Sequence, residues 1–457
     1  MKDKKLSSLL ESKSREELIV IIEDLCNEYE GLEERILFKY ITLEEDEEIK
    51  KNKKYLSEIT KKYGGGRRFV TWHQCDNYVK EVYEILCNAR DYYFDNKKPM
   101  VAVETSIAII TKMISATAYM DDSNGGIGDI VRESLGFLDE TCMDSDEFLK
   151  KDRTKIFNKL LKVADSNLYD GFEEWRLEII SNCIYFCDDE KLRRKFLDKL
   201  NTIIENYDDD WSGNYNKEQV LLIKLQIIIT YGTSEEEEEF INNNINYSGF
   251  REIYINKCID RKDFNKVLKL AQEGEIKDKS YAGLVIKWKK YRYIAYKNLQ
   301  MIDEQKGLAK ELLISGNIEF YEDLKELYIN EWDSFYPKLK NEFVEKGLNK
   351  LNLYPQILIK ENDLEELLEF IRADVRRIGE YDELLINDYK DDVDEIYCFY
   401  INEISKLASN RREYKKVCKI IKRYKELFDD IKTYKIVREL QVQHKKRPAF
   451  IDELEKI

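Results

Sequence analysis

The chain has 457 residues, of which 43% are hydrophobic and 37% are charged, and its formal net charge is −15. This hydrophobic content supports a large core and excludes wholesale disorder, and the length suits two or three domains or one long solenoid. With only 4 Pro and 18 Gly, the chain lacks the turn residues of an all-β or doubly wound α/β fold, so we expect helices joined by short turns. The negative charge disfavours nucleic acid and anionic membranes as general partners, but leaves room for a local basic patch.

The sequence pattern is that of a cytoplasmic protein with no membrane partner. Its nine cysteines are scattered and odd in number, which is typical of free buried thiols in a reduced compartment. The start, Met1-Lys2-Asp3-Lys4-Lys5, does not resemble a signal peptide. No apolar segment approaches the ~20 residues needed to span a bilayer.

The first region, residues 1–62, is predicted to be helical. Ser14 and Glu17 have the spacing of a capping box, and apolar residues follow at helical spacing. The run Gly64-Gly65-Gly66 then breaks the helical pattern and marks a boundary. After the capping box, two further helices are expected at about 31–40 and 43–62.

The second region, residues 63–210, is predicted to contain a long helix pair. Pro99 fits the first turn of the second helix of this pair, and a polar loop at 121–129 follows that helix. A polar break at 207–214 is the expected junction with the third region. The expected helices are 72–96, 98–120, 130–142, 145–166, 171–187 and 190–206.

The third region, residues 211–457, carries a recurring pattern that predicts stacked helical hairpins. Each copy has a polar, an acidic and a large apolar residue, then two apolar residues three and four positions later, which is the start of an amphipathic helix. Bulky residues stand where true tetratricopeptide repeats have small ones, so we expect an irregular right-handed α-solenoid in an all-α protein. The apolar run 221–229 is expected to be a buried helix, because no partner strand is visible. The copies begin at Lys262, Asn362 and Arg412, with a weaker one at Glu319.

The two glycine loops and the end of the chain resemble a known family. Gly65-Gly66-Arg67-Arg68-Phe69 precedes the long helix pair, the 121–129 loop follows it, and the chain ends with Arg447-Pro448-Ala449-Phe450 and seven further residues. From about Leu6 to Leu454, this order resembles the helical region found C-terminal to the zinc finger in bacterial SWIM-type zinc-finger proteins. The Cys-x-Cys and Cys-x-His pairs of that finger do not occur in the sequence. The resemblance therefore implies only the helical fold, and it brings no catalytic residues.

Two basic segments are candidate contacts for an anion or a nucleic acid. The backbone amides of residues 64–66, beside Arg67 and Arg68, suit an anion, although a P-loop signature is missing. The second segment mixes cations with aromatic residues, a combination that neutralises and stacks a single strand. On a helix, however, the same aromatic residues are also expected in the core. This second cluster comprises Lys287, Lys289, Lys290 and Arg292 with Trp288, Tyr291 and Tyr293.

The loop at 121–129 partly imitates a calcium-binding EF-hand. Counted from Asp122, it has suitable ligands at positions 3 and 12 but lacks the glycine required at position 6. We therefore expect neither a metal nor another cofactor, but an interhelix turn in which glycines take positive φ and Asn124 or Asp129 caps a helix. The loop residues that bear on this question are Asp121, Asp122, Asn124, Gly126 and Asp129.

The sequence gives no indication of catalysis. Its two histidines, His73 and His444, lack the context of a nucleophile pair or a zinc site, and His444 lies in what we expect to be a solvated basic end. Tyrosines in charged stretches are expected either to seal the edges of helix pairs or to form a recognition surface. We therefore expect a non-enzymatic scaffold that binds a protein or peptide partner in a groove, with a basic segment favoured by the acidic surface. The alternatives are a nucleic-acid accessory protein that uses residues 64–68 and 287–292, and a sensor of a small ligand or peptide.

Overall fold

The computed structural model of the protein describes residues 4–29, 31–65, 69–208 and 210–457. Within these ranges regular structure is helical, and extended pairing is limited to an isolated bridge between Val70 and Met120. The chain divides into two compact units, Met1–Tyr254 and Ile255–Ile457. The predicted all-α fold of successive helical hairpins is confirmed, and the hand of the superhelix stays a prediction.

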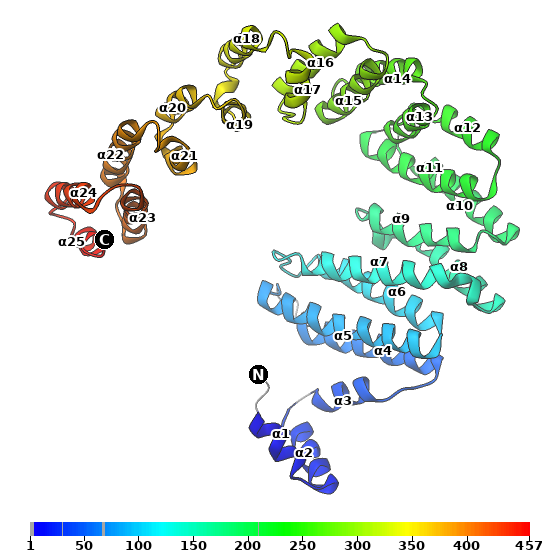
Figure 1. Ribbon diagram of the computed structural model, residues 1–457. Coiled ribbons are helices and arrows are strands. Elements are labelled where there is room, and N and C mark those ends of the chain that lie inside the picture. Colours follow the sequence, from blue (N-terminus) through cyan, green and yellow to red (C-terminus); the bar gives the residue numbers. More distant parts are fainter. Residues whose placement is uncertain (1–3, 30, 66–68, 209) are drawn as a thin grey trace. The chain divides into compact units, whose positions relative to one another are not determined.

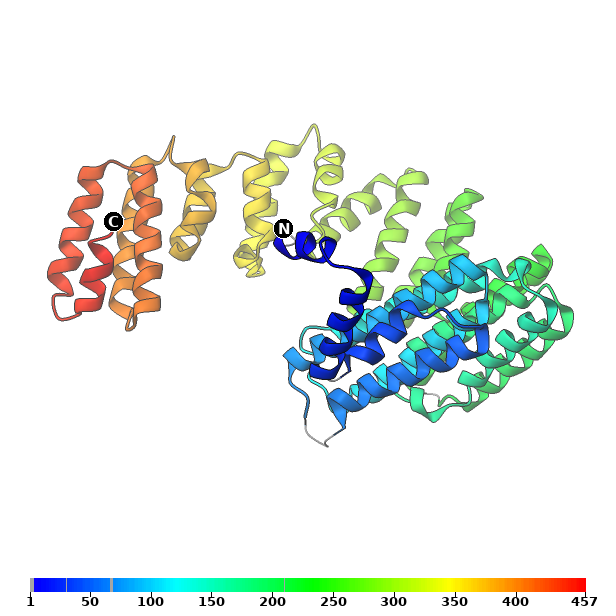
Figure 2. The same ribbon diagram turned by 90° about the horizontal axis from the view of Figure 1, so that it is seen from below.

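The helices of the first unit begin at several signals that the sequence displays (Figures 1 and 2). The predicted capping box is formed, because the Glu17 amide donates to Ser14 Oγ (3.2 Å) and the Ser14 amide donates to Glu17 Oε2 (2.9 Å). Pro99 is the first residue of its helix, as predicted. The helices are α1 (Lys4–Glu11), α2 (Arg15–Glu28), α3 (Leu32–Tyr40), α4 (Glu45–Gly64), α5 (Trp72–Asn96), α6 (Pro99–Ala116), α7 (Gly126–Met143), α8 (Lys150–Val163), α9 (Glu173–Ser181), α10 (Glu190–Asn206), α11 (Trp211–Tyr231), α12 (Ser234–Asn243) and α13 (Ser248–Asp260), which crosses into the second unit.

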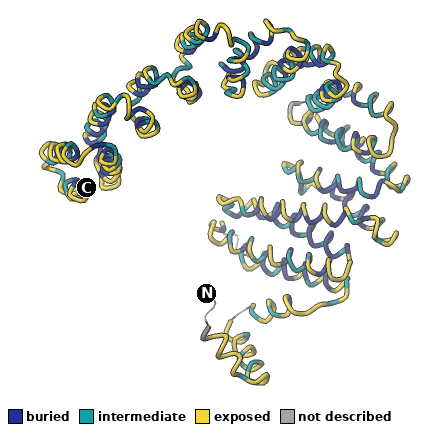
Figure 3. The backbone as a smooth tube through the Cα atoms, in the orientation of Figure 1, coloured by how far each residue is buried: buried dark blue, intermediate teal, exposed yellow. Residues whose placement is uncertain are grey.

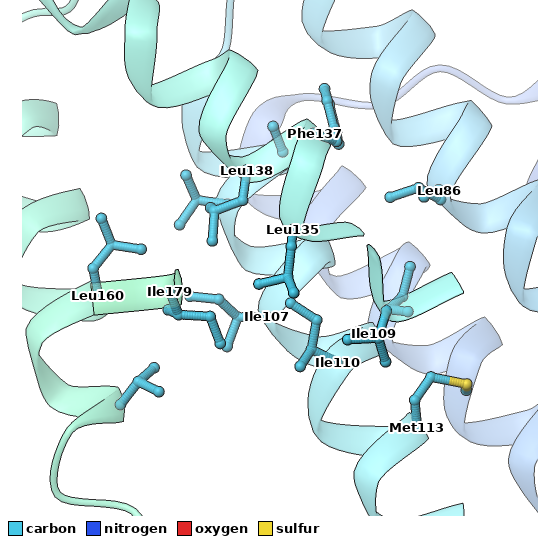
Figure 4. Close-up of a cluster of buried hydrophobic side chains, with 14 of the residues drawn as sticks. Leu86, Ile107, Ile109, Ile110, Met113, Leu135, Phe137, Leu138, Leu160 and Ile179 are labelled. Carbon is cyan, nitrogen blue, oxygen red and sulfur yellow. The ribbon is translucent and has the colours of Figure 1, made fainter. Parts of the chain in front are cut away.

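Helix α6 is the centre of the core in the first unit. It packs against α4, α5 and α7, so apolar side chains are buried on most of its sides. Ile109, Ile110 and Met113 have no exposed surface, and Figure 4 shows Ile110 beside Leu135 of α7. Burying each such side chain contributes about 1.5–3 kcal/mol to folding. Because α4 shares this core with α5 to α9, the residues before and after the glycine run belong to one packed body.

Among the described residues, α6 is the one helix whose length and composition would allow it to cross a membrane. However, 67% of its apolar window is buried inside the first unit. That degree of burial against neighbouring helices is what the core helix of a packed domain shows.

The predicted break at 207–214 separates α10 from α11, whereas the boundary between the compact units lies at Tyr254. Helix α11 returns to the first unit, because Val220 and Ile227 belong to the core formed by α4 to α10. The apolar run 221–229 lies within α11 and is helical, as predicted.

In the second unit the principal contacts join helices that lie one or two apart along the chain. Figure 2 shows the last four of these helices, in orange and red, side by side. At one point a small residue permits close approach, since a Cβ on Gly274 would lie 2.8 Å from the Trp288 ring. The helices are α14 (Phe264–Lys277), α15 (Ala282–Asn298), α16 (Ile302–Ile314), α17 (Phe320–Leu327), α18 (Trp332–Glu345), α19 (Leu353–Lys360), α20 (Leu364–Ala373), α21 (Ile378–Leu385), α22 (Lys390–Leu407), α23 (Arg411–Leu427), α24 (Asp430–Gln443) and α25 (Pro448–Leu454).

The recurring sequence pattern corresponds to a recurring turn between helices. Lys262 and Asn362 have left-handed backbones, with φ of 58° and 52°. The amides of the next residues, Asp263 and Asp363, each donate 2.8 Å bonds to the carbonyl five residues back, as in a Schellman motif. Both aspartates then cap the following helix through their side chains.

The other copies of the pattern vary this turn. The same backward bond is made after Gln300 and after Gly316, which also have positive φ. The weaker copy at Glu319 starts α17 without a side-chain cap. In the copy at Arg412, the helix begins at Arg411, three residues earlier in the pattern than in the copies at Lys262 and Asn362, and it is capped by Asn410. Thus the backbone geometry recurs more often than the sequence pattern does.

Tyrosines tie neighbouring helices of the second unit together through carboxylates. In the clearest case, Glu361 accepts hydrogen bonds from the Tyr321 hydroxyl, from Lys325 Nζ (2.5 Å) and from Trp332 Nε1 (2.9 Å). Burial raises the pKa of Glu361, but these three donors outweigh it and hold that pKa below its usual range. We call such an arrangement a tyrosine–carboxylate clamp; the others are Tyr293–Asp323, Tyr336–Asp363, Tyr354–Glu366, Tyr397–Asp382 and Tyr424–Asp394.

Candidate partner-binding groove

The first predicted anion contact lies partly outside the described residues. Arg67 and Arg68 belong to the range 66–68, which the structure does not describe. Gly64 is the last residue of α4 and lies against Tyr119, where a Cβ would approach the ring to 2.6 Å. Gly64 is therefore required for packing, and the anion contact stays a prediction.

The 121–129 loop is an interhelix turn. Gly125 has positive φ (74°), as predicted for a glycine there. The expected caps were wrong: Asp122 Oδ1 accepts from the Ile127 amide (2.9 Å), whereas Asn124 donates to Asp76 (2.9 Å) and Asp129 pairs with Arg132. Asp121 accepts from the Ser123 amide (3.1 Å), and Gly126 opens α7. In the described part of the chain, no three metal-ligating side chains gather.

The 287–292 cluster lies on α15, and carboxylates of its own unit neutralise most of its charge. Lys289 contacts Glu311 (2.6 Å), Lys290 contacts Glu319 (2.7 Å) and Arg292 contacts Glu275 (3.1 Å). Trp288 is fully buried and donates to Asp278 (2.7 Å), and Tyr293 is also buried. Lys287 and Tyr291 also interact with neighbouring groups. The cluster thus serves mainly to join α15 to its neighbours.

A basic stripe that the sequence analysis missed lies on α23. The helix buries Tyr414, Val417, Cys418, Ile421 and Tyr424 on one face. The opposite face carries five cations at spacings of three and four residues, which place them on one side of a helix. All five are exposed, and none forms an ion pair with the described residues. We call them the basic stripe: Arg412, Lys415, Lys416, Lys419 and Lys422.

An apolar groove runs beside the basic stripe, between α22 and α23. Its cavity has a volume of about 470 Å³. Leu407, a large aliphatic side chain that lines it, is 79% exposed. The groove therefore combines an apolar floor with a cationic rim. Its lining comprises Tyr400, Ile404, Leu407, Ala408, Val417 and Ile420, with Glu413, Lys416 and Lys419 at the rim.

Arg447 and His444, which lie between α24 and α25, contact the end of α22 next to this groove. Arg447 Nη1 donates to the carbonyls of Ser405 and Ala408 (both 2.9 Å), which are acceptors that a helix end leaves open. His444 Nε2 lies 3.1 Å from Ser405 Oγ. His444 is only 8% exposed, so our expectation of a solvated end was wrong for this residue, whereas Lys445 and Lys446 are exposed. Its burial, and then the charge of Arg447, lower the pKa of His444.

Burial raises the thiol pKa of several of the described cysteines. Cys183 and Cys187 are fully buried, and burial raises the pKa of both thiols. Cys398 is exposed as a whole residue. Burial of its sulfur atom, and then the nearby carboxylate of Asp394, nevertheless raise the pKa of its thiol to about 11. Since the thiolate is the nucleophile, the raised pKa values favour the protonated, less nucleophilic form of these three thiols.

Comparison with known proteins adds little to this geometry. No family model matches the chain, and no curated protein matches it. One solved structure that it resembles is a "Circular tandem repeat protein with novel repeat topology and enhanced subunit contact surfaces", with 13% identity over 89% of this chain and 94% of that chain. The TM-score of 0.17 is too low for the likeness to support any conclusion about function.

Proposed function

We propose that the protein is a non-catalytic helical-repeat scaffold that binds an acidic segment of a partner protein in the α22–α23 groove. The observation that supports this most directly is the basic stripe beside an exposed apolar floor, in a chain whose net charge is −15. In the rest of the unit cations are commonly paired with carboxylates, as at Lys325, Lys340 and Arg423. Cations left unpaired on one face are available to a partner.

The local charge reverses our expectation of a basic partner. Steering and specificity depend on the field at the contact surface, and at this groove that field is positive. A helical segment with acidic residues beside aliphatic ones would complement both the stripe and the floor. Helix-in-groove recognition of this kind uses apolar anchors at three- and four-residue spacing.

A single-stranded nucleic acid is the second candidate for the stripe, because its phosphates would also attract five cations. Such binding normally includes exposed aromatic rings on which bases stack. The groove offers one half-buried ring, Tyr400, among aliphatic side chains. The apolar floor therefore favours a peptide.

The test is fluorescence anisotropy of the full chain with three probes. These are a synthetic helical peptide with Leu at helical spacing and Glu at its polar positions, the same peptide with Lys for Glu, and an oligonucleotide of matched charge. We expect the Glu peptide alone to bind tightly. Preference for the oligonucleotide would replace the peptide proposal with the nucleic-acid one.

Variants then locate the binding site. Lys416→Glu with Lys419→Glu should weaken the affinity for the Glu peptide by about tenfold or more, and a tenfold loss corresponds to about 1.4 kcal/mol of binding free energy. The matched control, Lys445→Glu with Lys446→Glu, makes the same charge change at exposed residues outside the groove. Equal losses in both variants would indicate a non-specific field effect and would overturn the groove assignment.

A further inference from the structure

The first two helices present an apolar surface that no other described part of the first unit covers. Helix α2 has no buried residue, and Figure 3 shows α1 and α2 exposed along most of their length. On α2, Ile19, Ile22 and Leu25 are 45%, 46% and 39% exposed. On α1, Leu6 and Leu9 are 57% and 54% exposed. Large exposed apolar surfaces of this kind mark interaction sites.

The charges of α2 indicate what could cover it. The helix carries Glu16, Glu17, Glu23, Asp24 and Glu28 against a single cation in its own sequence. Of these, Glu17 is engaged by Lys13 (2.9 Å) and by the capping box. The other carboxylates have no ion pair among the described residues; Glu16 and Glu23 border the apolar stripe, whereas Asp24 lies on the opposite side of the helix. Helix α2 is therefore an acidic amphipathic helix without a partner.

A symmetric contact between two copies of α2 is disfavoured, because it would bring like charges together. The partner surface should instead be apolar and basic. The groove between α22 and α23 has that composition, and its cations are unpaired.

We propose that α2 of one copy of this chain docks in the α22–α23 groove of a second copy. This inference rests on the proposed function, since it takes the groove to be a receptor for acidic segments and names the segment. Ile19, Ile22 and Leu25 would lie on the apolar floor, and Glu16 and Glu23, which share the adjacent side of the helix, would face the basic stripe. Such a contact joins two different surfaces, so it generates a ring if the rotation closes and a filament if it does not.

The experiment is sedimentation velocity of the full chain over a range of protein and salt concentrations. We expect association that grows with protein concentration and is lost at high salt, where exposed charges are screened. Glu16→Lys with Glu23→Lys should abolish it, and so should Lys416→Glu with Lys419→Glu. Combining the four substitutions should restore it, because the charges of the two surfaces are exchanged. A control, Glu33→Lys with Glu34→Lys, makes the same change at exposed residues of α3 and should leave association intact.

Two results would overturn this inference. A chain that stays monomeric at all concentrations has no such contact. Association that persists in both charge-reversal pairs must use another surface. The peptide assay separates the two proposals: if the Glu peptide binds the groove while the chain stays monomeric, the proposed function stands and only the identity of the segment is wrong.

Discussion

In Met1–Tyr254 the helices close around side chains with no exposed surface, such as Ile109, Ile110 and Phe137, whereas in Ile255–Ile457 they are also joined by tyrosine–carboxylate clamps. The first unit has comparable pairs, such as Tyr93–Asp144 (2.6 Å), and the second unit has a continuous apolar core of its own. Apolar burial is non-directional, while a hydrogen bond fixes two groups in one geometry. We infer that burial stabilises both units and that the second unit relies more often on polar contacts to set its helix pairing.

The largest effect is expected from a cavity in the first core. Ile110→Ala should destabilise that unit by about 3 kcal/mol, because it removes a fully buried side chain that neighbours cannot replace. Hydrogen exchange measured by mass spectrometry should show the loss in α5 to α7 and leave α19 to α23 protected. Ile229→Ala, at a residue that is 55% exposed, is the matched control and should change stability by less than about 0.5 kcal/mol. Equal effects of the two substitutions would contradict a burial-dominated unit.

The next effect is expected from breaking a clamp. Glu361→Ala leaves the donors of Tyr321, Lys325 and Trp332 without their acceptor, at a cost of about 2–3 kcal/mol. Faster exchange should be confined to α17 to α20. Glu365→Ala removes an exposed carboxylate from the next helix and should have little effect. A similar response to both would mean that the clamp contributes no more than a surface charge.

A smaller difference separates two aspartates that occupy the same turn. Asp263→Ala removes a helix cap and should cost about 1 kcal/mol. Asp363→Ala removes a cap and also the acceptor of Tyr336 (2.9 Å) and Lys340 (2.6 Å), so it should cost about 2 kcal/mol. The urea midpoints of the two variants measure this difference. If Asp263→Ala and Asp363→Ala lowered the free energy of unfolding equally, the Tyr336–Asp363 clamp would contribute nothing to stability.

The smallest effect concerns pH and the end of the second unit. The pKa of His444 is lower in the folded protein than in the unfolded chain, so the unfolded state binds the proton more readily. Stability should therefore fall as pH decreases through about 6.5, the ordinary pKa of histidine. His444→Gln should flatten the dependence of the urea midpoint between pH 7 and pH 5.5. The depressed pKa values of Glu361 and Asp363 act only below their unfolded values, near pH 4, and leave this window undisturbed.

Features that depend on local sequence could be predicted. The structure contains three such features: the capping box at Ser14, the helix start at Pro99 and the bounds 72–96 of α5. Residues that are neighbours in the sequence determine each of them. The aspartates at 263 and 363 also mark helix starts through their own hydrogen bonds.

Features that depend on distant residues could not be predicted. His444 lies among basic residues in the sequence, yet the fold brings Ser405 and Phe450 against it. The spacing of the cations from Arg412 to Lys422 is visible in the sequence. Whether these cations are unpaired depends on which carboxylates the fold brings near them, and no local pattern shows that. The cations of the 287–292 cluster look similar in sequence and are neutralised by Glu275, Glu311 and Glu319.

The contacts between helices close in sequence have a consequence for how the second unit opens. When each helix depends mainly on its neighbours, stability approximates a sum of local terms, and unfolding can begin at one end and advance. His444 and Arg447, which lie between helices α24 and α25, hold the end of α22. Fraying of these two helices would release the groove while α14 to α20 remain folded. Binding at the groove would then be coupled to the order of the C-terminal helices, and a bound segment would protect them from proteolysis.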